Sequence, residues 1–155
     1  NMARIGFSPN SRKNNYRNDD AVEKVIRYVF DCKKTPNAII GALGATITDT
    51  DLMINQFLKV QEYYHKRKGK RIIHFYISFS NEEMERFILE DYRQIGYYIA
   101  DYFSDEYQVA FALHENTTHY HIHFVVNPVN CKTGKKYHWQ WSDTYKIKQI
   151  LKCFI

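Results

Sequence analysis

Two runs of strand-forming residues lie so close together that they limit the folds open to this chain. Residues 107–114, YQVAFALH, and residues 119–129, HYHIHFVVNPV, are rich in β-branched and aromatic residues, and only the polar residues ENTT separate them. So short a connection joins antiparallel neighbours, because parallel strands need a crossover of a dozen or more residues. The sequence therefore predicts a β-hairpin in the C-terminal half of the chain.

The other segments predict helices and strands in irregular alternation. Apolar residues recur at helical spacing in four segments, and β-branched or alternating residues mark three more strands. The helices are expected over residues 21–30, 49–67, 81–103 and 142–152, and the strands near residues 3–7, 38–45 and 71–80. Asn81 is expected to cap the long third helix. We expect an α/β (α+β) fold: a two-layer sandwich with a mainly antiparallel sheet, the hairpin at its centre and helices packed on one or both sides.

Length and cysteine content favour a single cytoplasmic domain. A chain of 155 residues buries a core of its own without disulfides, so residues 1–155 are interpreted as one domain. Its three cysteines have no CxxC pairing and lie far apart, which is typical of free thiols in a reducing compartment. No apolar run approaches the roughly 18 residues that a membrane-spanning helix needs, so we expect no membrane insertion.

The charge balance favours an anionic partner. Lysine and arginine total 22 against 17 acidic residues, which gives a net charge of +5. Aromatic residues make up 16% of the chain, and basic grooves lined by aromatic rings hold unstacked bases. Nucleic acid is therefore the leading candidate for a partner.

Histidines gather in the predicted hairpin. Side chains alternate along a strand, so His121 and His123 project from the same face, about 7 Å apart. His114 ends the neighbouring strand and can bring a third imidazole across, whereas His119 has the same parity but sits at the turn. Three neutral imidazoles can hold one divalent cation and leave positions open for a substrate. The alternative is a hydrogen-bonded or solvated pair, which is the more usual role of an isolated His-x-His.

The same residues carry a family resemblance. The run HENTTHYHIHFVVN resembles the third motif of P-type (VirD2-like) plasmid mobilisation relaxases, which belong to the HUH (His-hydrophobic-His) endonucleases. AVEKVIRYVFDCKK resembles the first motif, a helix that carries the nucleophilic tyrosine, and this implies that role for Tyr28. HFYISFSNEE resembles the second motif and implies that Ser78 lies near the DNA backbone. The three motifs run in the family's order over most of the chain.

The resemblance implies an activity. It implies metal-dependent, site- and strand-specific nicking and rejoining of DNA at the transfer origin of a plasmid or integrative element, through a covalent 5′-phosphotyrosine. The metal, Mg or Mn with Zn or Ni as alternatives, would be held by His114, His121 and His123. The implied partners are single-stranded DNA, accessory mobilisation proteins and a type IV secretion coupling protein, with export of the protein alongside the DNA. The native protein is expected to continue past Ile155.

One position departs from the family pattern. The family commonly has an acidic residue where this chain has Asn116, with Glu115 beside it, and that acid orients a metal-bound histidine. Either residue could take this supporting role. Asn127 shares the strand parity of His121 and His123, so it either supports the site or ends the strand.

Tyrosine is abundant, so the choice of nucleophile depends on motif position. The chain has 13 tyrosines, and most helix tyrosines pack on a core. A tyrosine hydroxyl is a weak nucleophile at neutral pH and needs a cation or a base beside it. Tyr28 is preferred, and Tyr16, in the polar segment before the helix, is the reserve candidate.

Cations and aromatic rings near both ends of the chain are the predicted DNA contacts. For each of these residues the alternative, a solvated cation or an aromatic ring that packs on the core, explains its presence about as well as DNA binding does. The predicted residues are Arg12, Lys13, Arg17, Lys132, Lys135, Lys136, Trp139 and Trp141. The basic run from Lys66 to Arg71 is interpreted as a solvated turn.

Three other functions stay open at this point. A rolling-circle replication initiator of the HUH group is disfavoured, because there the His-x-His motif usually precedes the tyrosine. A non-catalytic module for single-stranded DNA would explain the charge but not the histidines. A histidine-metal enzyme for small molecules would explain the histidines but not the basic surface. Replacing His121 by alanine separates a nuclease from a binding module.

Overall fold

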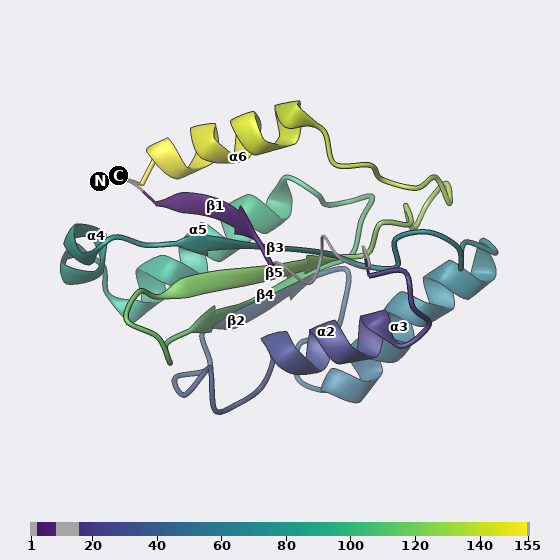
Figure 1. Cartoon of the computed structure of the whole chain (residues 1–155), viewed down its shortest axis with the longest axis horizontal. Coiled ribbons are helices and arrows are strands. Elements are labelled where there is room, and N and C mark those ends of the chain that lie inside the picture. The colour runs from purple at the N-terminus through teal and green to yellow at the C-terminus, as the bar shows by residue number, and fades with distance from the viewer. Residues whose placement is uncertain (1–2, 9–15, 155) are drawn as a thin grey trace.

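The structure contains one antiparallel sheet in which the histidine hairpin is central. In this computed structural model the strand order is β1-β3-β5-β4-β2, and each neighbouring pair is antiparallel (Figure 1). The strands are β1 (Arg4–Phe7), β2 (Ile40–Leu43), β3 (Ile73–Ser78), β4 (Val109–His114) and β5 (His121–Val126). The predicted hairpin of β4 and β5 is confirmed, and β5 is the middle strand.

The structure describes residues 3–8 and 16–154. Among these residues, no helix is both long and apolar enough to cross a bilayer. Cys32, Cys131 and Cys153 are all free thiols, as their spacing predicted.

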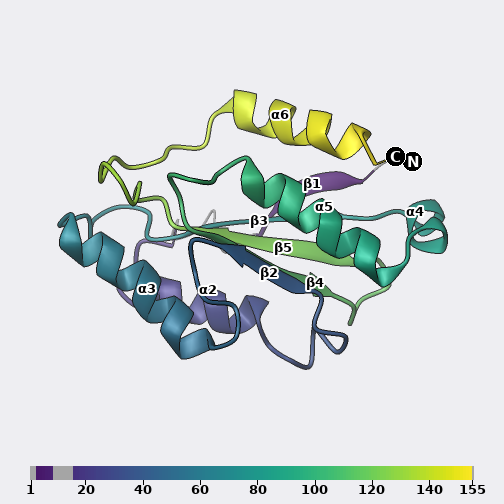
Figure 2. The same cartoon turned by 180° about the vertical axis from the view of Figure 1, so that it is seen from behind.

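Helices cover both faces of the sheet. The helices are α2 (Ala21–Val29), α3 (Thr50–Tyr63), α4 (Asn81–Arg86), α5 (Leu89–Asp101) and α6 (Trp141–Lys152). The helices α2 and α3 lie on one side of the sheet, and α5 and α6 lie on the other, as the front and back views show (Figures 1 and 2). The expected α+β fold with an antiparallel sheet flanked by helices is confirmed.

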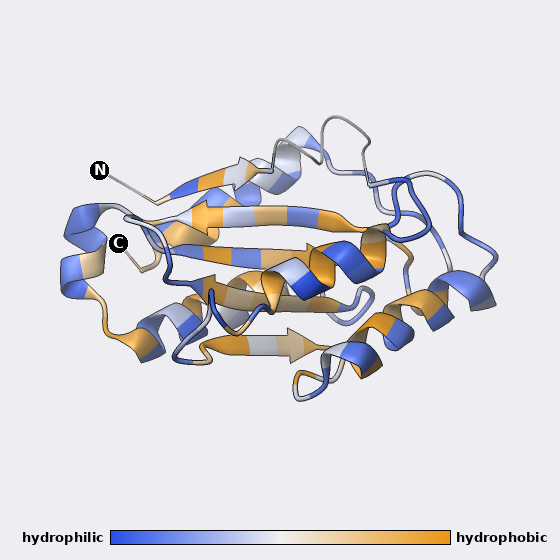
Figure 3. Ribbon diagram, turned by 60° about the horizontal axis from the view of Figure 1, so that its bottom comes forward, coloured by the Kyte–Doolittle hydropathy of each residue, from blue (hydrophilic) through white to orange (hydrophobic). Residues whose placement is uncertain are grey.

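Two hydrophobic cores follow from the alternation of side chains along the strands. The first core joins one face of the sheet, including Phe75, Phe111 and Phe124, to α5 and α6. The second core joins the small residues Ala110 and Ala112 to the apolar stripes of α2 and α3. Hydrophilic bands interrupt the hydrophobic ones along the strands in Figure 3.

The prediction of one continuous helix over residues 81–103 is wrong, because the segment forms two helices. The chain leaves helical geometry at Phe87 and Ile88, so α4 and α5 are separate helices. Phe87 turns back to pack edge-on against Phe79 and Tyr92, which a continuous helix would prevent. The cap is also one residue earlier than predicted, because the Ser80 hydroxyl accepts the Glu83 backbone N–H and Glu83 bonds back to Ser80.

Close packing of α5 on the sheet predicts the effect of a substitution. A Cβ atom added at Gly96 would overlap the ring of Phe111. Gly96→Ala is therefore expected to lower the free energy of unfolding by about 1–3 kcal/mol, although alanine normally favours a helix. Urea denaturation measures this. The exposed neighbour Gln94→Ala is the control and should change stability little; a Gly96→Ala variant as stable as the control would contradict the packing.

Candidate active site

Strand register places the polar side chains in rows on one face of the sheet. Ser78 pairs with His121, and His121 pairs with His114 on its other side. The next row contains Tyr76 and His123. Because alternate residues share a face, these rows continue to His74. The predicted metal ligands and Ser78 are therefore neighbours, drawn from three strands.

Tyr28 covers this row from the end of α2. Its ring centroid lies 5.5 Å from that of His114, 5.7 Å from His123 and 6.0 Å from His74, each in an edge-on arrangement. The side chain remains 46% exposed, so a substrate can reach it. A pocket of about 240 Å³ opens at this point, and it is lined by Ser8, Tyr28, His74, Tyr76, His114, Asn116, Thr117, His121 and His123.

The amphipathic pattern of α2 explains the orientation of Tyr28. Val22, Val25, Ile26 and Val29 form the buried stripe, and Tyr28 lies off that stripe. The helix end is fixed to the sheet by His114, whose Nε2–H donates to the Val29 carbonyl at 2.8 Å. The same contact that ends α2 on β4 thus brings its tyrosine over the imidazoles.

His74 belongs to the site, although it was not among the residues predicted from the sequence. Its Nε2 lies 2.8 Å from His123 Nδ1, and its Nδ1 lies 3.2 Å from the Tyr16 hydroxyl. A signal was present, because His74, Tyr76 and Ser78 alternate with apolar residues in β3 and so share one face. This alternation could not identify His123 as the partner of His74, because the pairing of β3 with β5 joins residues about fifty positions apart in the sequence.

Burial keeps the imidazoles uncharged at neutral pH. Desolvation, helped by the neighbouring His114, lowers the pKa of His74 to about 4. Desolvation also lowers the pKa of His114, His121 and His123. Neutral imidazoles can accept a proton or a metal ion, whereas imidazolium ions can do neither.

The arrangement of the rings is not that of a metal site. The rings of His114 and His123 are stacked, with centroids 4.0 Å apart and planes 28° apart. His114 Nε2 also donates to a carbonyl. Within residues 3–8 and 16–154, no three His, Cys, Asp or Glu side chains form a group that could hold a metal ion. The donor type fits a divalent cation, but the geometry does not.

The three residues expected to support the site lie in different surroundings. Glu115 turns away from the imidazoles, because both its carboxylate oxygens accept from Asn37 Nδ2 at 2.9 and 3.1 Å. Asn116 lines the pocket. Asn127 lies beyond the far end of β5, roughly 20 Å along the strand from His121. There its buried amide bonds to Gln61, Gln108 and the Phe57 carbonyl.

The predicted DNA contacts divide into exposed and packed residues. Trp141 is 78% exposed, whereas Trp139 packs on the first core against Phe7 and donates to the Thr144 hydroxyl. Arg17, Lys132 and Lys135 are exposed, and Lys136 is partly buried. Arg12 and Lys13 lie outside the described residues. Ser78 lines a second pocket of about 490 Å³ with Arg4 and His119.

The buried neutral histidines predict a loss of stability in acid. The pKa of His74 is about 6.5 in the unfolded chain but about 4 in the folded protein. Between these values the unfolded chain binds more protons, so acidification favours unfolding, by about 3 kcal/mol for His74 alone at pH 4. Urea denaturation from pH 7 to 4.5 should show the loss, and His74→Gln should reduce it. The exposed control His138→Gln should leave the slope unchanged; an equal slope in all three proteins would contradict the assignment.

Comparison with known proteins places the site in a family. The family described as "Relaxase: MobA/VirD2-like, nuclease domain" matches residues 28–153. Two curated relatives from Staphylococcus aureus, each named Protein rlx, are 32% identical over 89 residues and 30% identical over 101 residues. These matches cover 57% and 65% of this chain but only 27% and 30% of the relatives.

No solved structure matches the chain significantly. The chain spans less than a third of the length of the curated relatives that it matches. The family match begins at Tyr28 and includes the whole histidine hairpin. The chain therefore belongs to the MobA/VirD2-like relaxase family and contains its nuclease domain.

Proposed function

We propose that this domain nicks and rejoins one DNA strand at the transfer origin of a plasmid or integrative element, with Tyr28 as the nucleophile. The observation that carries the proposal is the position of the half-exposed Tyr28 ring, edge-on to His74, His114 and His123. A tyrosine whose ring lies against neutral imidazoles at an open pocket suits a nucleophile that must lose its proton. Family membership supports the same reaction.

The proposed step conserves the energy of the phosphodiester. The Tyr28 oxygen attacks phosphorus, a phosphotyrosine bond forms, and the bond from phosphorus to the 3′ oxygen breaks. The phenol proton passes to a neutral imidazole, and the imidazolium so formed returns a proton to the departing 3′ oxygen. His114 is suited to accept, because its Nε2–H is held by the Val29 carbonyl and its Nδ1 therefore carries the lone pair. A 3′ hydroxyl reverses the step and rejoins the strand.

Tyr28 is favoured over Tyr16 by exposure. Tyr16 is buried and its hydroxyl contacts His74, whereas the Tyr28 side chain is 46% exposed. Burial also raises the pKa of Tyr16, which opposes formation of a phenolate there. The reserve candidate is therefore less suited to attack a phosphate.

Metal dependence and protein partners stay predictions from the family resemblance. The residues supply neutral imidazoles but not a metal-binding geometry, so no step is assigned to a metal. Mg or Mn remains the expected cofactor. Accessory mobilisation proteins and a type IV secretion coupling protein remain the expected partners of a longer protein.

A second candidate function is a module that only binds single-stranded DNA. The exposed Trp141, with Lys148 Nζ 5.9 Å above its ring, and the exposed lysines would suit it. It would leave the histidine pocket and Tyr28 without a role. A rolling-circle initiator is disfavoured by the order of the motifs and by the family match.

Removing the Tyr28 hydroxyl tests the nucleophile. Tyr28→Phe is expected to abolish the covalent adduct with a labelled single-stranded origin oligonucleotide, because phenylalanine cannot form the phosphotyrosine bond. Denaturing electrophoresis measures the adduct. The exposed control Tyr98→Phe should retain it. An adduct that survives Tyr28→Phe would move the nucleophile to another tyrosine, with Tyr16 next.

Removing His121 separates the two candidate functions. We expect His121→Ala to bind the oligonucleotide about as tightly as the wild type but to form no adduct. The same samples test the metal dependence that the family resemblance implies: wild-type adduct that requires Mg or Mn and disappears in EDTA would support it, and adduct that persists in EDTA would contradict it. Fluorescence anisotropy and electrophoresis measure binding and adduct on the same samples. Tight binding with no adduct from the wild type, over several origins and with metal, would favour the binding module.

A further inference from the structure

A line of hydrogen bonds runs from Tyr16 into the histidine pocket. The Tyr16 hydroxyl lies 3.2 Å from His74 Nδ1, and His74 Nε2 lies 2.8 Å from His123 Nδ1. All three side chains are buried. The line therefore joins the segment before α2 to β3 and then to β5. Tyr16 lies outside the residues that match the family, so that match says nothing of it.

The tautomers of two pocket histidines are fixed locally. A carbonyl can only accept, so His114 carries its proton on Nε2, which contacts the Val29 carbonyl. The Thr117 hydroxyl donates to the His119 carbonyl at 2.7 Å and therefore accepts from His121 Nδ1 at 3.3 Å. His121 thus carries its proton on Nδ1. Neither tautomer depends on Tyr16.

His123 differs, because its Nδ1 contacts another imidazole. A neutral imidazole has one N–H and one lone pair, so it donates through one nitrogen and accepts through the other. If the Tyr16 hydroxyl donates to His74 Nδ1, then His74 Nε2 donates to His123 and leaves the proton of His123 on Nε2. If the direction reverses, His123 donates from Nδ1 and its Nε2 carries the lone pair. The direction of the hydrogen bond between Tyr16 and His74 therefore decides whether Nε2 of His123 carries a proton or a lone pair.

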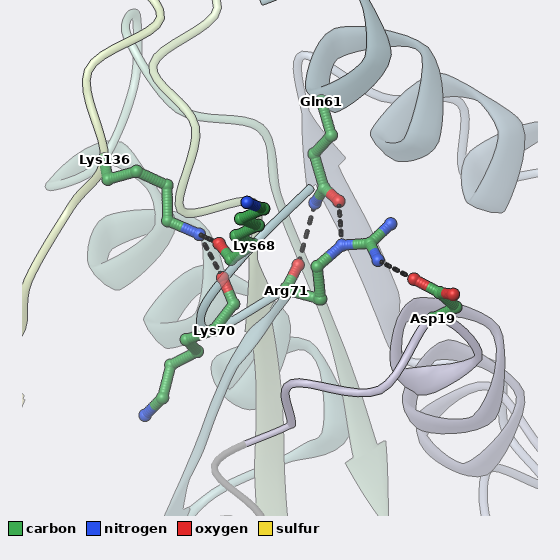
Figure 4. A network of polar contacts seen from close by, with 6 residues as sticks. All are labelled: Asp19, Gln61, Lys68, Lys70, Arg71 and Lys136. Carbon is green, nitrogen blue, oxygen red and sulfur yellow. Dashed lines mark hydrogen bonds and ion pairs between the residues drawn. The ribbon is translucent and has the colours of Figure 1, made fainter. Parts of the chain in front are cut away.

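Tyr16 is held firmly at the head of this line. Its backbone has a φ of 50°, a left-handed conformation that is costly for a tyrosine. The Arg71 backbone N–H donates to the Tyr16 carbonyl at 2.8 Å. The Arg71 side chain, fully buried, donates to Gln61 at 2.7 Å and to Asp19 at 2.9 Å (Figure 4). This anchor offsets the strain and keeps the phenol directed at His74.

We propose that Tyr16 is a positioning residue of the pocket, which acts through His74 to hold His123 in one ring orientation and one tautomer. The effect of Tyr16 on catalysis rests on the proposed function, but its effect on the His123 tautomer does not. The tautomer itself is a property of the folded protein without DNA. His123 lies beside Tyr28, so its free nitrogen determines whether the pocket offers a donor or an acceptor at that point.

The first test uses the wild-type protein. Two-bond ¹H–¹⁵N spectra of imidazole nitrogens, recorded at pH 7.5 in EDTA without DNA, identify the tautomers of His74 and His123. His74→Gln and His123→Gln assign the signals. We expect matched tautomers, with both residues protonated on Nε2 or both on Nδ1, because the shared bond requires it. One residue protonated on Nε2 and the other on Nδ1 would overturn the proposal whatever the variants do.

The second test removes the head of the line. Tyr16→Phe is expected to turn the single His123 tautomer into a mixture, while His114 and His121 stay as they are. Tyr92→Phe is the matched control, because it also removes a buried hydroxyl, one that has no hydrogen-bond partner among the described residues, from the other core. An unchanged His123 tautomer in folded Tyr16→Phe would overturn the proposal.

Adduct formation then links the tautomer to the reaction. Tyr16→Phe should lower the rate constant for adduct formation at saturating oligonucleotide by about tenfold or more, with the KM for DNA little changed. Tyr92→Phe should keep the wild-type rate. If the tautomer responds as expected but the wild type forms no adduct, the positioning role stands and the proposed function fails. If adduct forms normally in Tyr16→Phe, the catalytic consequence fails.

Discussion

Pairing of β5 along both edges is the constraint on which the rest of the structure depends. Because the strand is bonded to β3 on one side and β4 on the other, its alternation is imposed on three strands at once. One face, with Ile122 and Phe124, joins the first core. The other face presents His121 and His123. A shift of the register by one residue would turn His121 and His123 toward α5 and α6, and Ile122 and Phe124 toward the face covered by α2 and α3.

The hairpin, most of the element boundaries and the cluster of three imidazoles could be predicted from the sequence, because each depends on local spacing. The break between α4 and α5 could not, since it follows from the packing of Phe87 on distant aromatic rings. His74 was missed for a similar reason. Its histidine partner is supplied by the register between β3 and β5, and no local pattern encodes that register.

Charge is also distributed in a way that the sequence did not predict. His114, His121 and His123 lie toward the Ser78 end of β3 and are neutral, whereas cations gather at the other end, just before His74. There burial and the charges of Arg71, Lys66, Arg17 and Lys70 lower the pKa of Lys136 to about 8. The run 66–71 is not simply a solvated turn, because Lys136 donates to its Lys68 and Lys70 carbonyls and Arg71 is buried (Figure 4).

The two alanines of β4 have a consequence for the position of the nucleophile. Ala110 and Ala112 of β4 lie with Val125 of β5 in the core beneath α2 and α3, and side chains as small as alanine let a helix axis approach the strands closely. Tyr28 is carried by α2, so its height above His114 and His123 depends on these alanine volumes as well as on the bond from His114 to the Val29 carbonyl. The reach of the phenol is thus encoded in part in residues that take no part in the chemistry, and a family member with larger side chains there would need a different helix tilt to keep it.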